Sequence, residues 1–139
     1  MVVTAGQRND GVMLAQTLED IYVPRPRGRP RITPDTVLAD RGYTTGVNRS
    51  YLRRRHIMAV IPQKSNEITA RKKRGSKGGR TPAFDAQAYK GRNVVERSFN
   101  LLKQWRGLAT RYDKLAVTYR AAVVLAAVLT WLHILGDTP

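Results

Sequence analysis

The feature that most constrains the fold of this chain is a strand–helix–strand pattern between residues 36 and 61. Two short apolar segments, Thr36–Asp40 and Ile57–Ile61, are typical of buried strands, and the basic segment Gly46–Arg55 between them is typical of a helix. A crossover of this kind joins two parallel strands of one sheet. The pattern therefore predicts an α/β fold built on a parallel sheet.

Helices are predicted on both sides of this unit. Asn9 and Asp10 can cap a helix that runs to about residue 22. Toward the carboxyl end we expect one helix over residues 89–111 and a second, almost wholly apolar helix over residues 117–135. The uncharged part of the second helix, Ala121–Leu135, has 15 residues, whereas a bilayer span needs about 20. We therefore expect a buried helix and no membrane span.

The charge of the chain indicates a polyanionic partner. There are 25 Lys and Arg against 10 Asp and Glu, which gives a net charge of +15, and nucleic acid is the usual partner of such a chain. The segments 24–34 and 63–85 are predicted to be basic loops that contact DNA phosphates, unless they are merely solvated. Their candidate DNA-binding side chains are Arg25, Arg27, Arg29, Arg71, Lys72, Lys73, Arg74 and Lys77. The absence of cysteine excludes disulfides and thiolate metal sites.

Two of the acidic residues occupy positions that suit chemistry. Asp40 ends a predicted parallel strand, where open α/β sheets bind their ligands. Glu96 lies on a predicted helix, on which the spacing places four polar side chains within an arc of roughly 60°. They are Tyr89, Arg92, Glu96 and Lys103, and the opposite, core-facing stripe is Val94, Leu101, Trp105 and Leu108. A carboxylate between cations suits a metal-binding acid beside phosphate-binding bases.

Each of these polar residues also has a purely structural interpretation. Asp40 can form the turn that follows its strand, and Glu96 can pair with Arg92 on an exposed helix, which is worth only a few tenths of a kcal/mol. Tyr89 can pack at a helix start, and Lys103 can be solvated. The residues taken singly leave both interpretations open.

Several sequence words together resemble the DDE transposases of bacterial insertion sequences. LADRGY surrounds Asp40, and the four polar residues from 89 to 103 are separated by two, three and six residues. This spacing resembles the Tyr-(2)-Arg-(3)-Glu-(6)-Lys signature of one transposase subgroup. GQRND at 6–10 and VERSFNLLKQWRGLATRYDK at 95–114 fit as well. The resemblance covers nearly the whole chain.

The resemblance implies a ribonuclease-H-like (retroviral-integrase-like) fold, incomplete at its amino-terminal strands and ending in two long helices. It implies that Asp40 and Glu96 are catalytic ligands of two divalent ions, Mg²⁺ or Mn²⁺. Arg92 and Lys103 would contact DNA phosphate, and Tyr89 would contact the substrate end.

The resemblance also implies partners and a location. The partner is double-stranded DNA, both insertion-sequence ends and target DNA, and no small-molecule cofactor is expected. A homo-oligomer is possible because transposases generally act as multimers on paired ends. The implied location is the bacterial cytoplasm, at the nucleoid.

One part of the family pattern has no match in this sequence. Such proteins carry a first catalytic Asp on the opening strand, before the equivalent of GQRND, and no acidic residue precedes Asp10. Losing one member of a cooperating set of catalytic groups can cost several orders of magnitude in rate. We therefore expect residues 1–139 to be part of a catalytic domain that binds DNA but does not cut or join it alone. The two-metal site is expected only when the first Asp is present.

Two rival interpretations fit the composition. In one, the chain is a non-catalytic basic DNA-binding module whose groove helix is Asn48–Arg55 (NRSYLRRR). That interpretation predicts that neutralising Asp40 and Glu96 changes no activity. In the other, the chain is a small basic RNA-binding protein, which predicts few long apolar helices. The apolar segment 117–135 argues against it.

Overall fold

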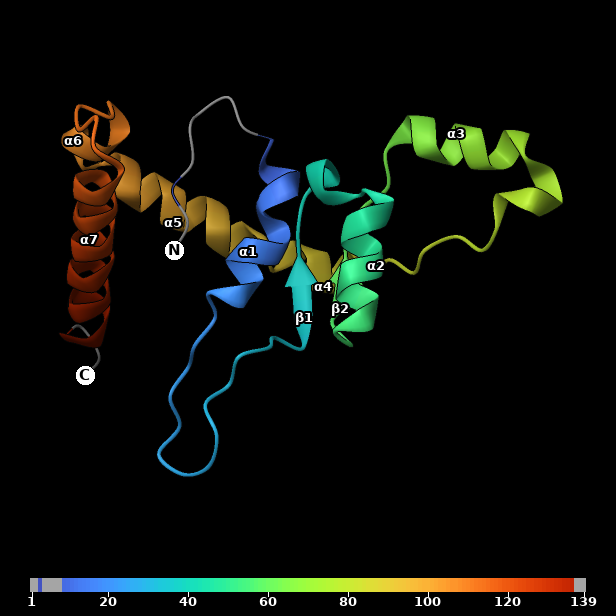
Figure 1. The fold of residues 1–139 in the computed structure, drawn as a ribbon. Coiled ribbons are helices and arrows are strands. Elements are labelled where there is room, and N and C mark those ends of the chain that lie inside the picture. The colour runs from blue at the N-terminus through green and yellow to red at the C-terminus, as the bar shows by residue number, and fades with distance from the viewer. Residues whose placement is uncertain (1–2, 4–8, 137–139) are drawn as a thin grey trace. The chain divides into compact units, whose positions relative to one another are not determined.

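The computed structural model describes residue 3 and residues 9–136, and it divides into two compact units (Figure 1). The division along the main part of the chain falls between Arg92 and Asn93. We call the part that ends at Arg92 the amino-terminal unit and the part that begins at Asn93 the carboxyl-terminal unit.

The predicted strand–helix–strand pattern is present in the amino-terminal unit. Strand β1 (Thr36–Leu38) pairs in parallel with β2 (Met58–Val60), and helix α2 (Gly46–Arg54) connects them (Figure 1). Thr36 is opposite Met58, and the register continues along both strands. The mixed α/β class is thus confirmed, and the small parallel sheet is compatible with a ribonuclease-H-like fold.

Two helices cover one face of this sheet. The 3-10 helix η1 (Asp10–Met13) begins where the side chain of Asn9 accepts the N–H of Gly11 at 2.8 Å, and it leads into α1 (Leu14–Glu19). α1 and α2 bury an apolar cluster against the sheet and its ends. Its members are Leu14, Leu18, Ala39, Leu52, Ile57 and Ile61.

The prediction that both strands are buried is only partly right. Val37 and Ala59 pack against the core, whereas Met58 on the alternate face is 62 % exposed. Successive side chains of a strand point to opposite faces, so cover from α1 and α2 reaches only one of them. Val60 is nevertheless buried.

The segment 63–85, predicted to be a loop, contains a helix. Helix α3 (Ser65–Lys73) is followed by the 3-10 helix η3 (Gly75–Gly78). Glu67, in the first turn of α3, accepts the N–H of Lys64 at 3.4 Å, and three cations occupy the last turn. An acid at the start and cations at the end both complement the helix dipole, which explains why so basic a segment is helical.

The single helix predicted over residues 89–111 is wrong, because three shorter helices take its place. They are α4 (Ala86–Lys90), α5 (Asn93–Lys103) and α6 (Arg106–Ala109). A turn at Gly91 separates the first two, and Trp105, with an extended backbone at φ −79° and ψ 98°, precedes the third. Glycine weakens a helix interior by roughly 0.5–1 kcal/mol relative to Ala.

The apolar stripe predicted for the same helix is also mostly uncovered. Val94, Leu101 and Trp105 are exposed, and Leu108 alone of the four is buried.

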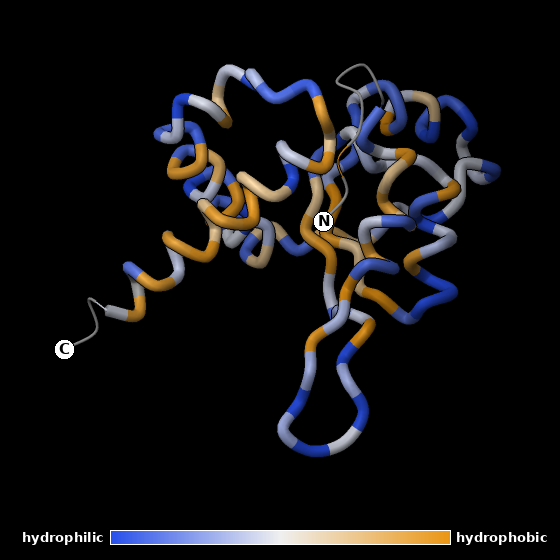
Figure 2. Tube along the Cα trace, turned by 60° about the vertical axis from the view of Figure 1, so that its left-hand side comes forward, coloured by the Kyte–Doolittle hydropathy of each residue, from blue (hydrophilic) through white to orange (hydrophobic). Residues whose placement is uncertain are grey.

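The last helix, α7 (Ala116–Gly136), is longer and more exposed than predicted. It contacts α5 and α6, yet among its described side chains only Ala126 is buried, at 2 % exposure, and Trp131 is 72 % exposed. The prediction of a buried helix is therefore wrong. Hydrophobic residues follow the helix along its length (Figure 2), and two short neighbours cannot cover every side.

By length and composition, residues 116–133 would also suffice to cross a membrane. This differs from the expectation, which counted only the 15 uncharged residues, because the 18-residue span begins at Ala116 and includes the charged Arg120. A single helix of this kind is weak evidence for a membrane protein.

Candidate active-site residues and basic surfaces

Asp40 lies just beyond the carboxyl end of β1, where the sequence places it. Its side chain is exposed, and Oδ1 accepts the N–H of Gly42 at 2.7 Å, which caps the 3-10 helix η2 (Arg41–Tyr43). The turn-forming interpretation of Asp40 is therefore confirmed. An exposed carboxylate on an ordered turn can in addition bind a cation.

Tyr43 closes the turn that Asp40 begins. Its side chain is half-buried, and burial raises the pKa of the phenol, with smaller upward contributions from the carboxylates of Asp10 and Asp40. The phenol is therefore protonated at neutral pH.

Asn48, which the rival DNA-binding interpretation places on a groove helix, instead supports this turn from within. It is buried, and its Nδ2 donates to the carbonyl oxygen of Gly11 at 2.9 Å and to that of Tyr43 at 3.4 Å. Asn48 thus joins η1 to the turn that carries Asp40. Because its amide is used inside the protein, it is not available to read bases.

We expect Asn48→Ala to destabilise the amino-terminal unit by about 1–3 kcal/mol, because a buried carbonyl loses its partner. The measurement is hydrogen exchange of the backbone amides of residues 46–61. Ser50→Ala, at an exposed position on α2, is the matched control and should change the exchange little. Equal exchange in both variants would contradict the supporting role of Asn48.

Tyr89 and Arg92 form a local pair in the amino-terminal unit. Both are half-buried, and the Arg92 guanidinium lies 6.0 Å from the centre of the Tyr89 ring. The N–H of Arg92 donates to the carbonyl oxygen of Tyr89 at 3.0 Å. Phe84 adds a second ring contact to Tyr89, with centroids 5.4 Å apart. The pair therefore presents a guanidinium next to an aromatic group.

Glu96 and Lys103 belong to the carboxyl-terminal unit, where both lie on α5 and both are exposed. Their separation of seven residues is about two helical turns, so they share one face of the helix. The single face predicted to carry all four signature residues is therefore divided between α4, the turn after it and α5. That Asp40 and Glu96 bind the same divalent ions, as the resemblance implies, stays a prediction.

The basic surface of α3 and η3 consists of one arginine that is hydrogen-bonded within the protein and several cations that are exposed. Arg71 is half-buried and donates to Gln63 Oε1 at 3.0 Å and to Thr81 Oγ1 at 3.4 Å, beside a cavity of about 400 Å³. A side chain at Gly78 would come within 2.4 Å of the Arg71 carbonyl oxygen, so η3 fits tightly against α3. The exposed cations of this surface are Lys72, Lys73, Arg74 and Lys77.

Glu67 links this surface to the turn that carries Asp40, a role that the sequence did not reveal. Its Oε1 accepts the hydroxyl of Thr44 at 2.5 Å. Burial lowers the pKa of nearby Arg49, an effect that Glu67 opposes and Arg71 reinforces. Arg49 donates to the carbonyl oxygen of Ile61 at 3.0 Å, so this cation is also committed to structure.

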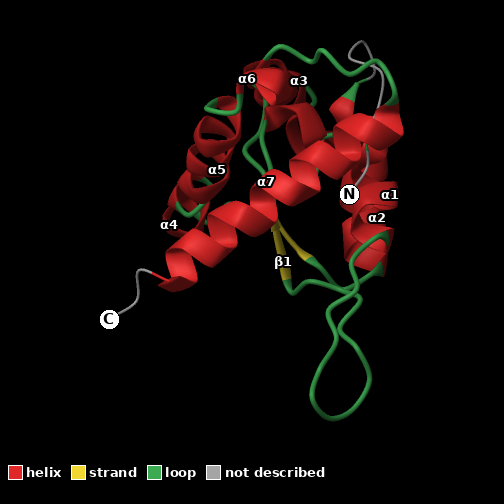
Figure 3. Cartoon of the chain, turned by 90° about the vertical axis from the view of Figure 1, so that its left-hand side faces the viewer, coloured by secondary structure: helices red, strands yellow, loops and turns green. Residues whose placement is uncertain are grey.

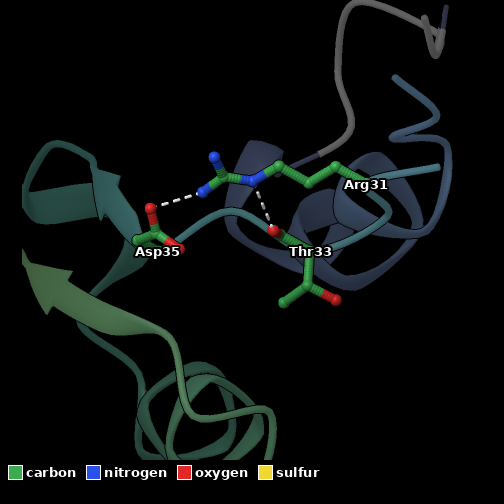
Figure 4. A network of polar contacts seen from close by, with 3 residues as sticks. All are labelled: Arg31, Thr33 and Asp35. Carbon is green, nitrogen blue, oxygen red and sulfur yellow. Dashed lines mark hydrogen bonds and ion pairs between the residues drawn. The ribbon is translucent and has the colours of Figure 1, made fainter. Parts of the chain in front are cut away.

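In the basic loop at 24–34, one arginine forms contacts at the base of the loop and three other arginines are exposed. Arg31 contacts Asp35 at 2.5 Å and donates through Nε to the carbonyl oxygen of Thr33 at 3.1 Å (Figure 4). Arg25, Arg27 and Arg29 are exposed. The DNA-binding candidates of this loop therefore remain accessible, while Arg31 is structural.

Asp40 and Glu96 have the chemistry that a divalent ion requires, since exposed carboxylates are hard oxygen donors of the kind that Mg²⁺ and Mn²⁺ prefer. Within either unit, the described residues form no group of three or more Asp, Glu, His or Cys that could hold a metal ion.

A family model described as Transposase DDE domain matches residues 1–131 of the 139, a range that includes Asp40 and Glu96. No curated protein and no solved structure matches the chain. Because the matched range is almost the entire sequence, the chain belongs to the Transposase DDE domain family.

Proposed function

We propose that this chain is part of the catalytic domain of an insertion-sequence transposase, with Asp40 and Glu96 as ligands of Mg²⁺ or Mn²⁺. Its family consists of DDE transposases, which are polynucleotidyl transferases and generally use divalent metals. The observation that carries the proposal is Asp40, an exposed carboxylate at the carboxyl end of a parallel strand in a chain of this family. Bound ions would activate the attacking oxygen and stabilise the leaving oxygen.

The other signature residues would hold the DNA strand. The Arg92 guanidinium can pair with a phosphate, while the adjacent Tyr89 ring offers a face on which a base can stack. Lys103 shares a helix face with Glu96 and would add a second phosphate contact close to that carboxylate. These roles explain why a phenol, a guanidinium and an ammonium accompany one acid.

The exposed cations of the α3 and η3 surface and of the loop at 24–34 would bind double-stranded DNA at both the element ends and the target. Phosphate contacts of this kind depend little on sequence and weaken steeply with salt. Transposases are generally soluble and cytoplasmic, and DNA binding would place the chain at the bacterial nucleoid. A homo-oligomer on paired DNA ends belongs to the same proposal.

We further propose that residues 1–139 bind DNA but do not cut it unaided. The ligand set holds only Asp40 and Glu96, and a carboxylate that matches the first catalytic Asp of the family is absent from these residues. A cooperating set that lacks one member loses most of its rate.

The proposal is tested by incubating the purified chain with duplex DNA and Mg²⁺ or Mn²⁺. We expect retarded duplex without strand breaks, and binding that falls linearly on a log–log plot against salt concentration. The double variant Lys72→Ala with Lys73→Ala should make the slope of that plot shallower by about 2, because two phosphate contacts are lost. Metal-dependent strand breaks that disappear in Glu96→Gln would show that the chain is active alone, and salt-independent binding would contradict the phosphate contacts.

A further inference from the structure

We infer that the loop between Val23 and Arg31 inserts its tip, Arg27–Gly28–Arg29, into the minor groove of A·T-rich duplex DNA. The inference rests on the proposed DNA binding and adds to it a groove and a base composition. We call residues 23–31 the arginine hairpin.

The two ends of the arginine hairpin are fixed to each other. The N–H of Val23 donates to the carbonyl oxygen of Arg31 at 2.9 Å, and the N–H of Arg31 donates back at 2.8 Å. The contacts of Arg31 with Asp35 and Thr33 tie this base to the segment that enters β1 (Figure 4). Beyond the bridge, the loop extends away from α1, α2 and β1 (Figure 3). The tip of the arginine hairpin is thus held on an ordered base.

The seven residues inside the bridge have an unusual composition. They are three Pro, three Arg and one Gly, with no acid and no large apolar side chain. Proline fixes its own φ and carries no N–H, so a chain rich in it is extended and loses little entropy on binding. Pro26 and Pro30 bracket the tip. The hairpin therefore offers a slender, pre-extended backbone with guanidinium groups as its only charged groups.

Gly28 makes the tip narrow enough for a groove. Its φ of +85° is in the region that favours glycine, and no heavy atom lies within 4 Å of the position a Cβ would occupy. The minor groove is about 6 Å wide, and it is narrower and more negative in A-tracts, where inserted arginines are attracted. A backbone without a side chain at the tip can approach the groove floor while Arg27 and Arg29 extend along it in both directions.

The same features disfavour other partners. The major groove accommodates a helix or a two-stranded ribbon, and the arginine hairpin is neither, since a single bridge closes it. The minor groove of A-form RNA is wide and shallow, so it would not enclose the tip. The residues between Val23 and Arg31 include none of the aromatic or aliphatic side chains that insert into a lipid surface.

The test varies one chemical group in the groove. The purified 139-residue chain is titrated, by fluorescence anisotropy, into four duplexes of equal length made of A·T, inosine·C, G·C and diaminopurine·T pairs. Only the last two carry an amino group in the minor groove. We expect A·T and inosine·C to bind equally, and roughly tenfold more tightly than G·C and diaminopurine·T.

Two variants assign this preference to the arginine hairpin. Arg27→Ala with Arg29→Ala should remove the preference, whereas Arg53→Ala with Arg54→Ala, which removes the same charge from exposed positions on α2, should keep it. Unchanged hydrogen exchange of residues 46–61 in both variants shows that the fold is retained.

Several results would overturn the inference. Equal binding of all four duplexes would overturn minor-groove insertion but would leave the proposed DNA binding intact. Binding of the inosine·C duplex with the affinity of the G·C duplex would have the same consequence. Failure to bind any duplex would overturn both. Tighter binding to duplex RNA or to anionic vesicles than to A·T duplex would assign the arginine hairpin to another partner and exclude the minor groove.

Discussion

Asp40→Asn and Glu96→Gln are each expected to lower DNA strand cleavage and joining by several orders of magnitude when residues 1–139 are joined to a segment that supplies the first carboxylate. Each change keeps the size of the side chain and removes its negative charge, so metal affinity falls while packing is preserved. The Asn side chain can still accept the N–H of Gly42 and cap η2. Loss of activity would therefore report on chemistry and not on the turn.

DNA binding is expected to persist in both variants, because the exposed cations are untouched. Asp113→Asn, an exposed acid outside the signature, is the charge-matched control and should leave strand transfer unchanged. The assay is joining of a pre-cut element end to plasmid DNA with Mg²⁺ or Mn²⁺. Full activity in the Asp40 or Glu96 variant would favour the non-catalytic DNA-binding module.

Leu52→Ala is expected to destabilise the amino-terminal unit by about 2–5 kcal/mol, which is a large fraction of the stability of a small domain. The Leu52 side chain is 0 % exposed, so truncation leaves a cavity between α2 and its neighbours in the core. Val47→Ala is the control on the same helix, at a position that is 77 % exposed, and it should change stability by less than about 0.5 kcal/mol.

The readout for Leu52→Ala must report on the correct unit. Both tryptophans, Trp105 and Trp131, lie in the carboxyl-terminal unit, so tryptophan fluorescence does not follow the core around Leu52. Hydrogen exchange of the amides in residues 46–61 does. Protection that is as strong in Leu52→Ala as in Val47→Ala would show that α2 does not hold this unit together.

The parts of the fold that followed from the sequence are those encoded by short-range patterns. Apolar residues in two strands, with a basic helix between them, were sufficient to predict the parallel pair and the position of Asp40 after β1. The side chain of Asn9 caps η1 as its residue type suggests. In each case the deciding contacts lie within one element or between consecutive elements.

The parts that did not follow depend on partners that are distant in sequence or on competing local signals. Asn48 is buried at a position where its amide donates to the carbonyl oxygen of Gly11, which is 37 residues away in the sequence. The spacing of the transposase signature has a helical period, but Gly91 interrupts the helix within it. The high positive charge of residues 65–73 led to the prediction of a loop, although these residues form α3. The apolar sequence of α7 led to the prediction of a buried helix, although the described residues leave most of its side chains exposed.

The arginine hairpin also has a consequence for limited proteolysis. Trypsin cleaves after Arg but not before Pro, so Pro26 protects the bond after Arg25 and Pro30 protects the bond after Arg29. Between Pro24 and Pro30, the single susceptible bond is Arg27–Gly28, which lies at an exposed tip where proteases act readily. One nick at this bond would report directly whether the tip is open to solvent or shielded by bound duplex.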